Sequence, residues 1–475
     1  MKTSVRTRFA PSPTGPLHMG NLRTALFNYL FAHHHKGKLI VRVEDTDKER
    51  SEKRWEEDML SNLTWLGLTW DEGPYRQSER TKIYKASLEK LLNEGKAYWC
   101  FCSSEQLAQE REEQEKRGEA PRYAGTCRSL SKKEAQEKLK NGVPGVIRFL
   151  NPGRKISFED LVRGTIEFDT SLSGDFVIAK DSENPLYNFT VVVDDHDMKI
   201  THVIRGEDHI PNTPRQILMQ EALGFESPQY AHLPLLLGED RTKLSKRQGD
   251  MSVTRFRQEG YLPESILNFL ALLGWNPGGE QEVFSLKELV EKFSLDRVQK
   301  GGAVFDAKRL EWLSGHYIRE TPLEELTKLA LPYLEKSGVP IESLDSKKLQ
   351  SIVQLFQERL KALGELPELA GFFFKTELEY ETDLLKWKDM SSQKASESLE
   401  RASNVLNGIV EPWSPESLEK ALLETAGEDK GGLLWPLRVA LSGRKASPPP
   451  FDIASILGKN EAIRRIRHAQ HLLTS

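Results

Sequence analysis

Residues 8–21 read Arg8-Phe9-Ala10-Pro11-Ser12-Pro13-Thr14-Gly15-Pro16-Leu17-His18-Met19-Gly20-Asn21. This stretch opens with a short segment that we expect to be a strand, and its prolines and glycine then form a stiff turn that no helix can cross. Apolar residues at helical spacing follow, namely Leu22, Ala25, Leu26, Tyr29 and Leu30. The next apolar run, 39–41, is continuous, as expected for a strand buried on both faces. Strand, loop, helix and strand together predict a βαβ unit.

In a βαβ unit, ligands bind where the loop leaves the first strand, and phosphate groups lie at the N-terminus of the helix. His18 and Gly20 lie on this loop, and a glycine allows the backbone to approach a ligand closely. Taken alone, however, a His-x-Gly sequence is more often a structural turn with a capping histidine, because so short a motif has a high false-positive rate.

A second motif lies far downstream, where residues 243–247 read Lys243-Leu244-Ser245-Lys246-Arg247. Alone, a basic loop is usually a solvated surface. Together, the two motifs resemble the signatures of class I aminoacyl-tRNA synthetases, His-Ile-Gly-His and Lys-Met-Ser-Lys-Ser. The string from Ala10 to Asn21, with Val43-Glu44-Asp45-Thr46-Asp47 and Val203-Ile204-Arg205-Gly206-Glu207-Asp208-His209, resembles the glutamyl/glutaminyl subgroup and, within it, the bacterial-type glutamyl-tRNA synthetases. The resemblance is strong over residues 1–320 and weaker beyond them.

Composition sets limits on where and how such a protein works. A chain of 475 residues is long enough for about three domains. No apolar run approaches the length of a membrane span, and we expect no secretory signal. Three cysteines do not form a disulfide framework, so we expect a reducing, cytoplasmic setting. The formal net charge of −4 means that an RNA partner would bind through local basic patches.

We expect a Rossmann-like α/β catalytic domain in residues 1–97 and 191–250, interrupted by residues 98–190. The resemblance implies that this insertion is the connective segment that holds the tRNA acceptor end, that residues 251–320 form a linker domain, and that residues 321–475 are an all-α anticodon-binding region. Sequence patterns predict helices over 51–66, 83–92, 214–223 and 265–273, and β-strands over 145–150, 165–168, 175–179 and 201–204. Ser131 and Glu134 are spaced as in a helix-capping box.

The C-terminal third reads as helical. Apolar residues from Leu349 to Leu363 are spaced to hold one helix face, and Ser414-Pro415 is a good helix start. Residues 447–450 read as a short rigid linker, followed by a last helix from Ile453 that carries several basic residues. The resemblance to synthetases makes Arg359 and Lys361, expected on the same helix as Phe356, candidates for reading the anticodon.

The resemblance also implies how glutamate is held. Arg8 with Tyr187 would take the γ-carboxylate, and Arg205 would orient the α-carboxylate, because an arginine fork can bond both oxygens of a carboxylate. Glu44 would pair with the α-amino group. Ala10 and Ser12 would shape the floor of the site.

For ATP, the resemblance assigns phosphate contacts to His18 and to the amides near Gly20 and Asn21. Lys243 and Lys246 would add positive charge, with Ser245 in a loop that closes over the site. His18, Lys243 and Lys246 are the expected catalytic residues, and Mg²⁺ is expected with ATP. Ribose and adenine contacts would come from Asp208, His209 and Leu236. Asn21 stands where the class consensus has histidine, which puts one contact to the nucleotide in doubt.

The three cysteines, Cys100, Cys102 and Cys127, all lie in the insertion. Zinc prefers four sulfur or nitrogen ligands in a tetrahedral arrangement. Some relatives place a fourth ligand two residues after the last cysteine, where this chain has Ser129, and others use a tyrosine four residues before it, where Tyr123 stands. Two alternatives therefore stay open, a zinc site at Cys100, Cys102, Tyr123 and Cys127, or three reduced cysteines without metal.

The resemblance implies that the chain is a monomer that charges tRNA-Glu with L-glutamate at the expense of ATP, and that tRNA is needed for activation. Competing interpretations are a glutaminyl-tRNA synthetase, which would end in β-barrels, a truncated paralogue without an anticodon domain, and a non-catalytic RNA-binding relative. Whether tRNA-Gln is also charged stays open.

Overall fold

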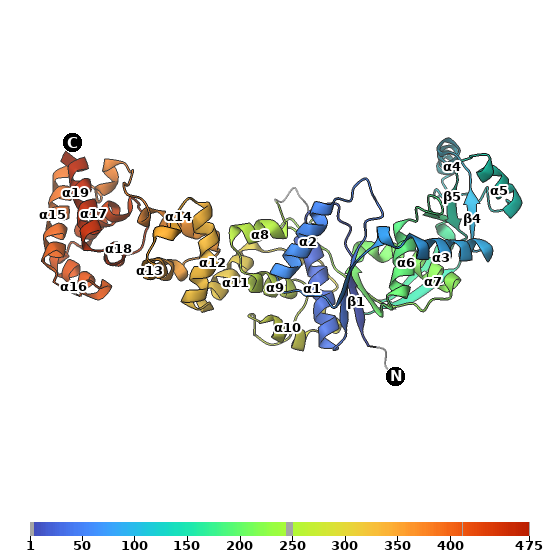
Figure 1. The fold of residues 1–475 in the computed structure, drawn as a ribbon, viewed down its shortest axis with the longest axis horizontal. Helices are drawn as coiled ribbons and strands as arrows, with labels where there is room; N and C mark the ends of the chain where they lie inside the picture. The colour runs from blue at the N-terminus through green and yellow to red at the C-terminus, as the bar shows by residue number, and fades with distance from the viewer. Residues whose placement is uncertain (1–3, 244–249, 411, 475) are drawn as a thin grey trace. The chain divides into compact units, whose positions relative to one another are not determined.

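The computed structural model describes residues 4–243, 250–410 and 412–474 (Figure 1). The chain divides into two compact units. The first comprises residues 1–257 and 263–310, and the second comprises residues 258–262 and 311–475. Four residues of the second motif lie outside the described residues, namely Leu244, Ser245, Lys246 and Arg247.

The predicted βαβ unit opens the first compact unit. Strands β1 (Arg6–Phe9) and β2 (Lys38–Val43) pair in parallel, and α1 (Met19–His34) connects them. Helix α1 lies beside β1 (Figure 1) and buries its predicted apolar face, with Leu22, Leu26 and Leu30 fully inaccessible. Strand β3 (Glu72–Arg76) adds to the other edge of β2. Two helices flank β3 in sequence, α2 (Lys53–Trp65) and α3 (Thr81–Asn93).

The second half of the α/β fold follows the insertion. Helix α6 (Tyr187–Asp197) leads to the predicted strand β9 (His202–Gly206), which pairs in parallel with β10 (Gln229–Leu233). Between them, α7 (Thr213–Leu223) ends at Gly224, whose φ of 73° is left-handed, as expected for a glycine that closes a helix. The amide of Thr201, just before β9, donates to the carbonyl of Arg6, so β9 and β1 meet at their first residues.

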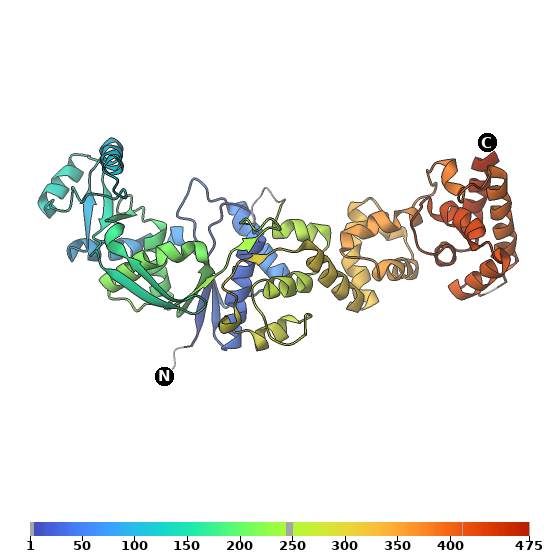
Figure 2. The ribbon, with the colours of Figure 1, turned by 180° about the vertical axis from the view of Figure 1, so that it is seen from behind.

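The insertion contributes two separate pieces. One is an antiparallel sheet in the order β4 (Ala97–Cys100), β5 (Val146–Phe149), β8 (Phe176–Ala179), with helices α4 (Ser104–Lys116) and α5 (Lys132–Lys140). The predicted capping box of Ser131 and Glu134 starts α5. The other piece is a hairpin of β6 (Lys155–Asp160) and β7 (Gly164–Asp169), which Figure 2 shows from behind. This hairpin joins the sheet of β9 and β10, because β6 pairs in parallel with β10.

The rest of the first unit consists of short elements. Strands β11 (Leu236–Leu237) and β12 (Ala303–Val304) pair in parallel. The helices are α8 (Val253–Glu259), α9 (Pro263–Leu272), α10 (Leu286–Lys292) and the start of α11 (Ala307–Glu320).

The second unit is helical throughout the elements assigned to it. Its helices after α11 are α12 (Leu323–Lys336), α13 (Ser346–Gln357), α14 (Leu366–Ala370), α15 (Ser392–Gly408), α16 (Pro415–Ala426), α17 (Lys430–Ser442), α18 (Pro450–Leu457) and α19 (Lys459–Thr474). Their apolar faces form one core that includes Ile352, Phe356 and Leu399.

Two expectations about this unit were wrong in detail. The helix that carries Phe356 ends at Gln357, so Arg359 and Lys361 lie in the turn that follows it. The last helix is interrupted, because Gly458 has a φ of 81° and separates α18 from α19. The predicted rigid linker 447–450 overlaps α18 by one residue, because Pro450 is the first residue of that helix. Across the described residues, none of the helices has the length and apolarity needed to span a membrane.

Candidate functional site

A cavity of about 540 Å³ opens at the carboxyl ends of β1, β2 and β9, where an open parallel sheet places its ligands. The loop after β1 and the first turn of α1 form one wall. The N-terminus of α6 and the residues after β9 and β10 form the rest. The structure brings most of the predicted residues together here, namely Arg8, Ala10, His18, Gly20, Asn21, Glu44, Tyr187, Arg205, Asp208, His209, Leu236 and Lys243.

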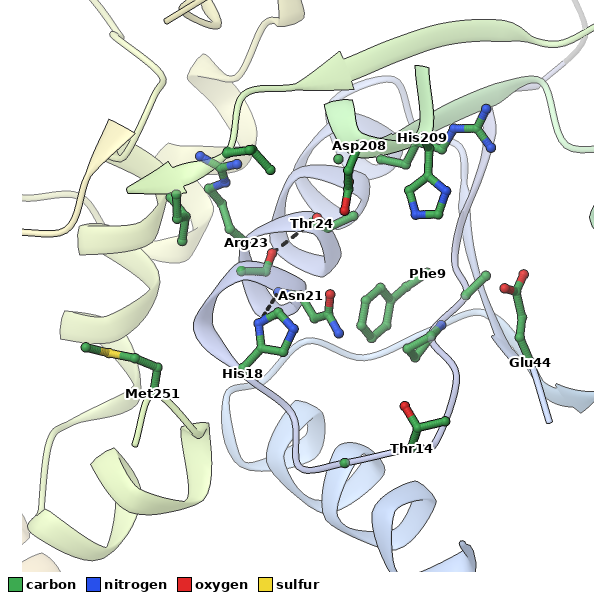
Figure 3. A pocket seen from close by; sticks show the side chains of 18 of the residues that line it. Phe9, Thr14, His18, Asn21, Arg23, Thr24, Glu44, Asp208, His209 and Met251 are labelled. Atoms are coloured by element: carbon green, nitrogen blue, oxygen red, sulfur yellow. Dashed lines mark hydrogen bonds between the residues drawn. The ribbon is translucent and has the colours of Figure 1, made fainter. Parts of the chain in front are cut away.

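His18 is the N-cap of α1, and its Nδ1 accepts a hydrogen bond from the amide of Asn21 at 3.3 Å (Figure 3). A Cβ on Gly20 would approach the imidazole Cε1 to 3.1 Å, so glycine keeps room for the ring. The capping interpretation of His18 is therefore correct, and the same imidazole also lines the cavity.

One end of the cavity is built on a buried chain of alternating charges. Arg8 lies 3.3 Å from Asp195 through its Nε, and Arg42 contacts Asp195 at 2.7 Å and Glu44 at 3.0 Å. Each of these side chains is at most 6% exposed. Burial raises the pKa of Asp195, but Arg8 and Arg42 outweigh it and hold that pKa below its usual range. Burial raises the pKa of Glu44 to about 6 despite the nearby arginines.

Arg205, the fourth residue of β9, is 5% exposed and lines the same end. Its Nε donates to Nε2 of His232 at 3.2 Å, and its Nη2 donates to the hydroxyl of Thr213 at 2.8 Å. Its Nη1 is buried, and among the described residues it has neither a hydrogen-bond partner nor a carboxylate within ion-pair distance. Burial lowers the pKa of this guanidinium. A buried cation without an internal counter-ion is costly, so the geometry favours an anionic ligand beside Arg205.

Tyr187, the first residue of α6, also lines the cavity. Its hydroxyl lies 3.2 Å from Nδ1 of His209, and burial, reinforced by the charge of Glu44, raises its pKa to about 12. Burial also lowers the pKa of His209 to about 4. Both groups are therefore neutral hydrogen-bonding groups near pH 7.

The other end of the cavity is open to solvent. The ammonium of Lys243 lies 3.4 Å from Asp208, and these side chains are 62% and 50% exposed. Figure 3 shows Asp208 and His209 across the cavity from His18 and Asn21. Ser12 is exposed and is not among the residues that line the cavity. Ser245 and Lys246 lie outside the described residues.

Residues not anticipated from the sequence support the site. Arg42 and Asp195 hold Arg8 and Glu44 in place, as described above. Arg23 lines the cavity and donates to the carbonyls of Leu273, at 3.2 Å, and Pro234. The sequence does hint at a role for Arg42, because this charged residue lies inside the buried apolar strand β2.

A second cluster lies in the insertion, away from the cavity-lining residues. The sulfur atoms of Cys100, Cys102 and Cys127 lie within 4.8 Å of one another. The hydroxyl of Tyr123 lies 3.4 Å from the sulfur of Cys100 and 3.6 Å from that of Cys102. The sequence left the fourth ligand open, and the structure places the Tyr123 hydroxyl against the cysteines, whereas Ser129 is exposed.

Comparisons with known proteins agree with this architecture. Residues 4–312 match the family described as class I tRNA synthetases (E and Q), catalytic domain, and residues 325–470 match an anticodon binding domain. The glutamate–tRNA ligase of Carboxydothermus hydrogenoformans is 46% identical over 97% of this chain and 99% of its own. That of Desulforamulus reducens is 45% identical over 98% and 99%.

The crystal structure of a glutamate tRNA ligase from Elizabethkingia meningosepticum, in complex with its amino acid, has a TM-score of 0.87 and 33% identity, covering 98% of this chain and 99% of that one. The expected family and the expected fold class, an α/β catalytic domain followed by a helical region, are thereby confirmed. Likeness in sequence and in fold over nearly the whole chain means that this protein belongs to the glutamate–tRNA ligase family of class I aminoacyl-tRNA synthetases.

Proposed function

We propose that the chain joins L-glutamate to the 3′-terminal adenosine of tRNA-Glu in two steps. First, an α-carboxylate oxygen of glutamate attacks the α-phosphorus of ATP, and the bond to the leaving pyrophosphate breaks. The glutamyl-adenylate then transfers its acyl group to the ribose hydroxyl of the tRNA, and AMP leaves. The observation that carries this proposal is the buried guanidinium of Arg205, a residue that lines the cavity and whose Nη1 has no hydrogen-bond partner among the described residues.

The buried end of the cavity suits an amino acid with two carboxylates and one ammonium group. Arg205 would bind the α-carboxylate. Arg8 uses only its Nε toward Asp195 among the described residues, so its Nη groups would bind the γ-carboxylate, with Tyr187 donating beside them. Glu44 supplies the negative charge for the ammonium group, and Ala10 forms part of the wall. Charge-assisted pairs of this kind are strong when they are sheltered from water.

The open end of the cavity suits a nucleotide. The first turn of α1 presents backbone N–H groups and the positive end of the helix dipole, which favour phosphate. His18, Gly20 and Asn21 would contact the phosphates there, with charge from Lys243 and Lys246. Asp208, His209 and Leu236 would border ribose and adenine. The protein then holds the reactants in line and neutralises the charge that develops at phosphorus, while Mg²⁺ enters with ATP as part of the substrate.

We also propose that Cys100, Cys102, Tyr123 and Cys127 hold a structural zinc ion. Tetrahedral zinc with Zn–S bonds of about 2.3 Å keeps its sulfur atoms about 3.8 Å apart. The sulfur atoms of Cys102 and Cys127 are 3.6 Å apart, close to that spacing. The ion would tie the end of β4 to the loop at residues 123–127. Elemental analysis should find about one zinc per chain, lost in Cys127→Ser; a metal-free wild type would contradict the proposal.

We assign the remaining regions by the family's organisation. Residues 1–97 and 191–250 form the catalytic domain, residues 98–190 hold the acceptor end, residues 251–320 form the linker, and residues 321–475 read the anticodon. The chain would act as a monomer in the cytoplasm, where tRNA is charged. Arg359 is exposed and stays a candidate for anticodon contact, whereas the ammonium of Lys361 lies 2.6 Å from Glu311.

The decisive experiment is ATP–pyrophosphate exchange with purified chain, glutamate and tRNA-Glu. Exchange should require both glutamate and tRNA, and should not occur with glutamine. Exchange that ignores glutamate, or none at all, would overturn the proposal. Charging assays with tRNA-Gln in place of tRNA-Glu decide whether the enzyme is strict, and product on tRNA-Gln would identify a non-discriminating enzyme.

A further inference from the structure

Three buried side chains form a hydrogen-bonded chain behind the glutamate end of the cavity. Asp160 Oδ2 lies 2.6 Å from Nδ1 of His232, and Nε2 of His232 accepts from Nε of Arg205 at 3.2 Å. The side chains of Asp160 and His232 are completely inaccessible to solvent. Arg205 and His232 are also direct partners in the parallel register of β9 and β10.

The donors and acceptors in this chain allow one arrangement of protons. An arginine Nε can only donate, so Nε2 of His232 must be unprotonated. The ring proton of the neutral imidazole is then on Nδ1, where it is donated to the carboxylate of Asp160. If the proton moved to Nε2, two N–H groups would face each other and Arg205 would lose this support.

Asp160 is well held for this task. It is the last residue of β6, and its Oδ1 accepts from the amides of Val162 and Arg163, which form the turn of the β6–β7 hairpin. The amide of His232 also donates to Asp160, at 3.1 Å. The guanidinium of Arg163 returns the contact by donating to the carbonyl of His232 at 3.2 Å. The hairpin turn thus bonds both the backbone amide and the backbone carbonyl of His232 in β10.

We propose that His232 is a positioning residue for Arg205, and that Asp160 fixes the His232 tautomer that this requires. The proposal rests on the proposed function, in which Arg205 binds a carboxylate of glutamate. The hydrogen bonds from His232 and Thr213 leave Arg205 one rigid orientation, with Nη1 free for the substrate. The glutamate site therefore depends on a residue of the insertion, outside the nucleotide-binding fold.

The test uses the full chain and measures the KM for glutamate and for ATP in tRNA-dependent ATP–pyrophosphate exchange. His232→Leu removes the acceptor, and Asp160→Asn reverses the tautomer, because an amide NH₂ in place of Oδ2 favours the proton on Nε2. Both should raise the KM for glutamate about 10- to 100-fold, the size of effect that loss of an outer-shell hydrogen bond has at metal sites, with the KM for ATP changed less than twofold. His232→Gln keeps one donor and one acceptor and should recover part of the loss.

A matched control is Asn268→Leu, which removes another fully buried polar side chain of this unit, one that bonds the backbone of Glu282 and Phe284 and does not touch Arg205. Thermal unfolding of each variant shows which ones are folded. If His232→Leu does not fold, Asp160→Asn carries the test, because it changes a single atom. Glutamate KM values within twofold of the wild type in Asp160→Asn, or equal rises for glutamate and ATP, would overturn the proposal.

A second readout does not depend on activity. In the ¹⁵N spectrum of the imidazoles, the signals of His232 are the ones that disappear in His232→Gln. They should show the ring proton on Nδ1 in the wild type and on Nε2 in Asp160→Asn. A wild-type Nε2–H would refute the inference. If the wild type lacks glutamate-dependent exchange, the proposed function fails instead, and the tautomer measurement still tests the Asp160–His232–Arg205 chain.

Discussion

The two ends of the cavity hold their charged side chains in opposite ways. At the end where we propose that glutamate binds, Arg8, Glu44 and Arg205 are each 5% exposed and are held by partners that are themselves buried. At the end proposed for the nucleotide, Lys243 and Asp208 keep 62% and 50% of their side chains in solvent. Charges removed from water interact strongly, whereas exposed charges are screened and contribute little.

Burying charged side chains at one end of the cavity lowers the stability of the protein without ligand. A buried cation that lacks an internal counter-ion destabilises the empty protein, and the ligand removes that penalty when it binds. Arg8 has the carboxylate of Asp195 beside it, whereas Arg205 has only neutral hydrogen-bond partners among the described residues. The charge of Arg205 should therefore depend more on a bound carboxylate than the charge of Arg8 does.

The largest effect is expected from Arg205→Leu. The value of kcat/KM for glutamate should fall about 10³-fold or more, equivalent to about 4–5 kcal/mol of lost transition-state stabilisation, because a sheltered carboxylate loses its partner. The melting temperature should not fall, since the variant also removes an uncompensated buried charge, and Thr213 and His232 can bond each other across 3.1 Å. Kinetics and thermal unfolding of the same preparation test both parts. A large loss of stability would show that Arg205 mainly supports the fold.

Lys246→Ala tests the opposite end. The expected loss is in kcat for adenylate formation, about 10²-fold, because a charge aimed at the phosphates acts mostly in the transition state. The KM for glutamate should stay near the wild-type value. Single-turnover adenylate formation measures the chemical step directly. An unchanged kcat with a raised KM for glutamate would contradict the separation of the two ends.

Arg8→Lys should have a smaller effect than Arg205→Leu. Lysine keeps the positive charge beside Asp195 but loses the fork that binds two oxygens, so about 2 kcal/mol of glutamate binding should be lost. Arg8→Leu should lose more, and neither variant should change the KM for ATP. Kinetics with glutamate, glutamine and ATP check this. Equal losses for glutamate and ATP would mean that Arg8 does not belong to the glutamate end alone.

The smallest effect concerns pH. In the proposed function Glu44 binds the substrate ammonium as a carboxylate, and burial raises its pKa to about 6. Acidification through that value protonates Glu44, so the KM for glutamate should rise below about pH 6, approaching tenfold per pH unit, while above it the KM is constant. Measuring KM between pH 5 and 8 checks this. Glu44→Gln should have a high KM at every pH and no step, and a step that persists in this variant would exclude Glu44 as its origin.

Much of the local structure could be predicted because its causes lie within a few residues. The Pro-Gly loop, the apolar spacing of α1 and the helix closure at Gly224 each depend on near neighbours in sequence. The same holds for the capping box at Ser131 and for the helix start at Ser414. Where prediction failed, at the end of α13 and at Gly458, the apolar spacing continued across a break in the helix.

By itself, then, the sequence determined the βαβ start, the family and the residue types at the carboxyl ends of the strands. Only the tertiary structure decided which of these meet. Arg42 and Asp195 are 153 residues apart, and Asp160 and His232 are 72 apart. Tyr123 reaches Cys100 across 23 residues. Hydrogen bonds along a helix or turn are encoded in short spacings, whereas the pairing of buried charges depends on how distant segments pack, because only packing excludes the water that would otherwise solvate them.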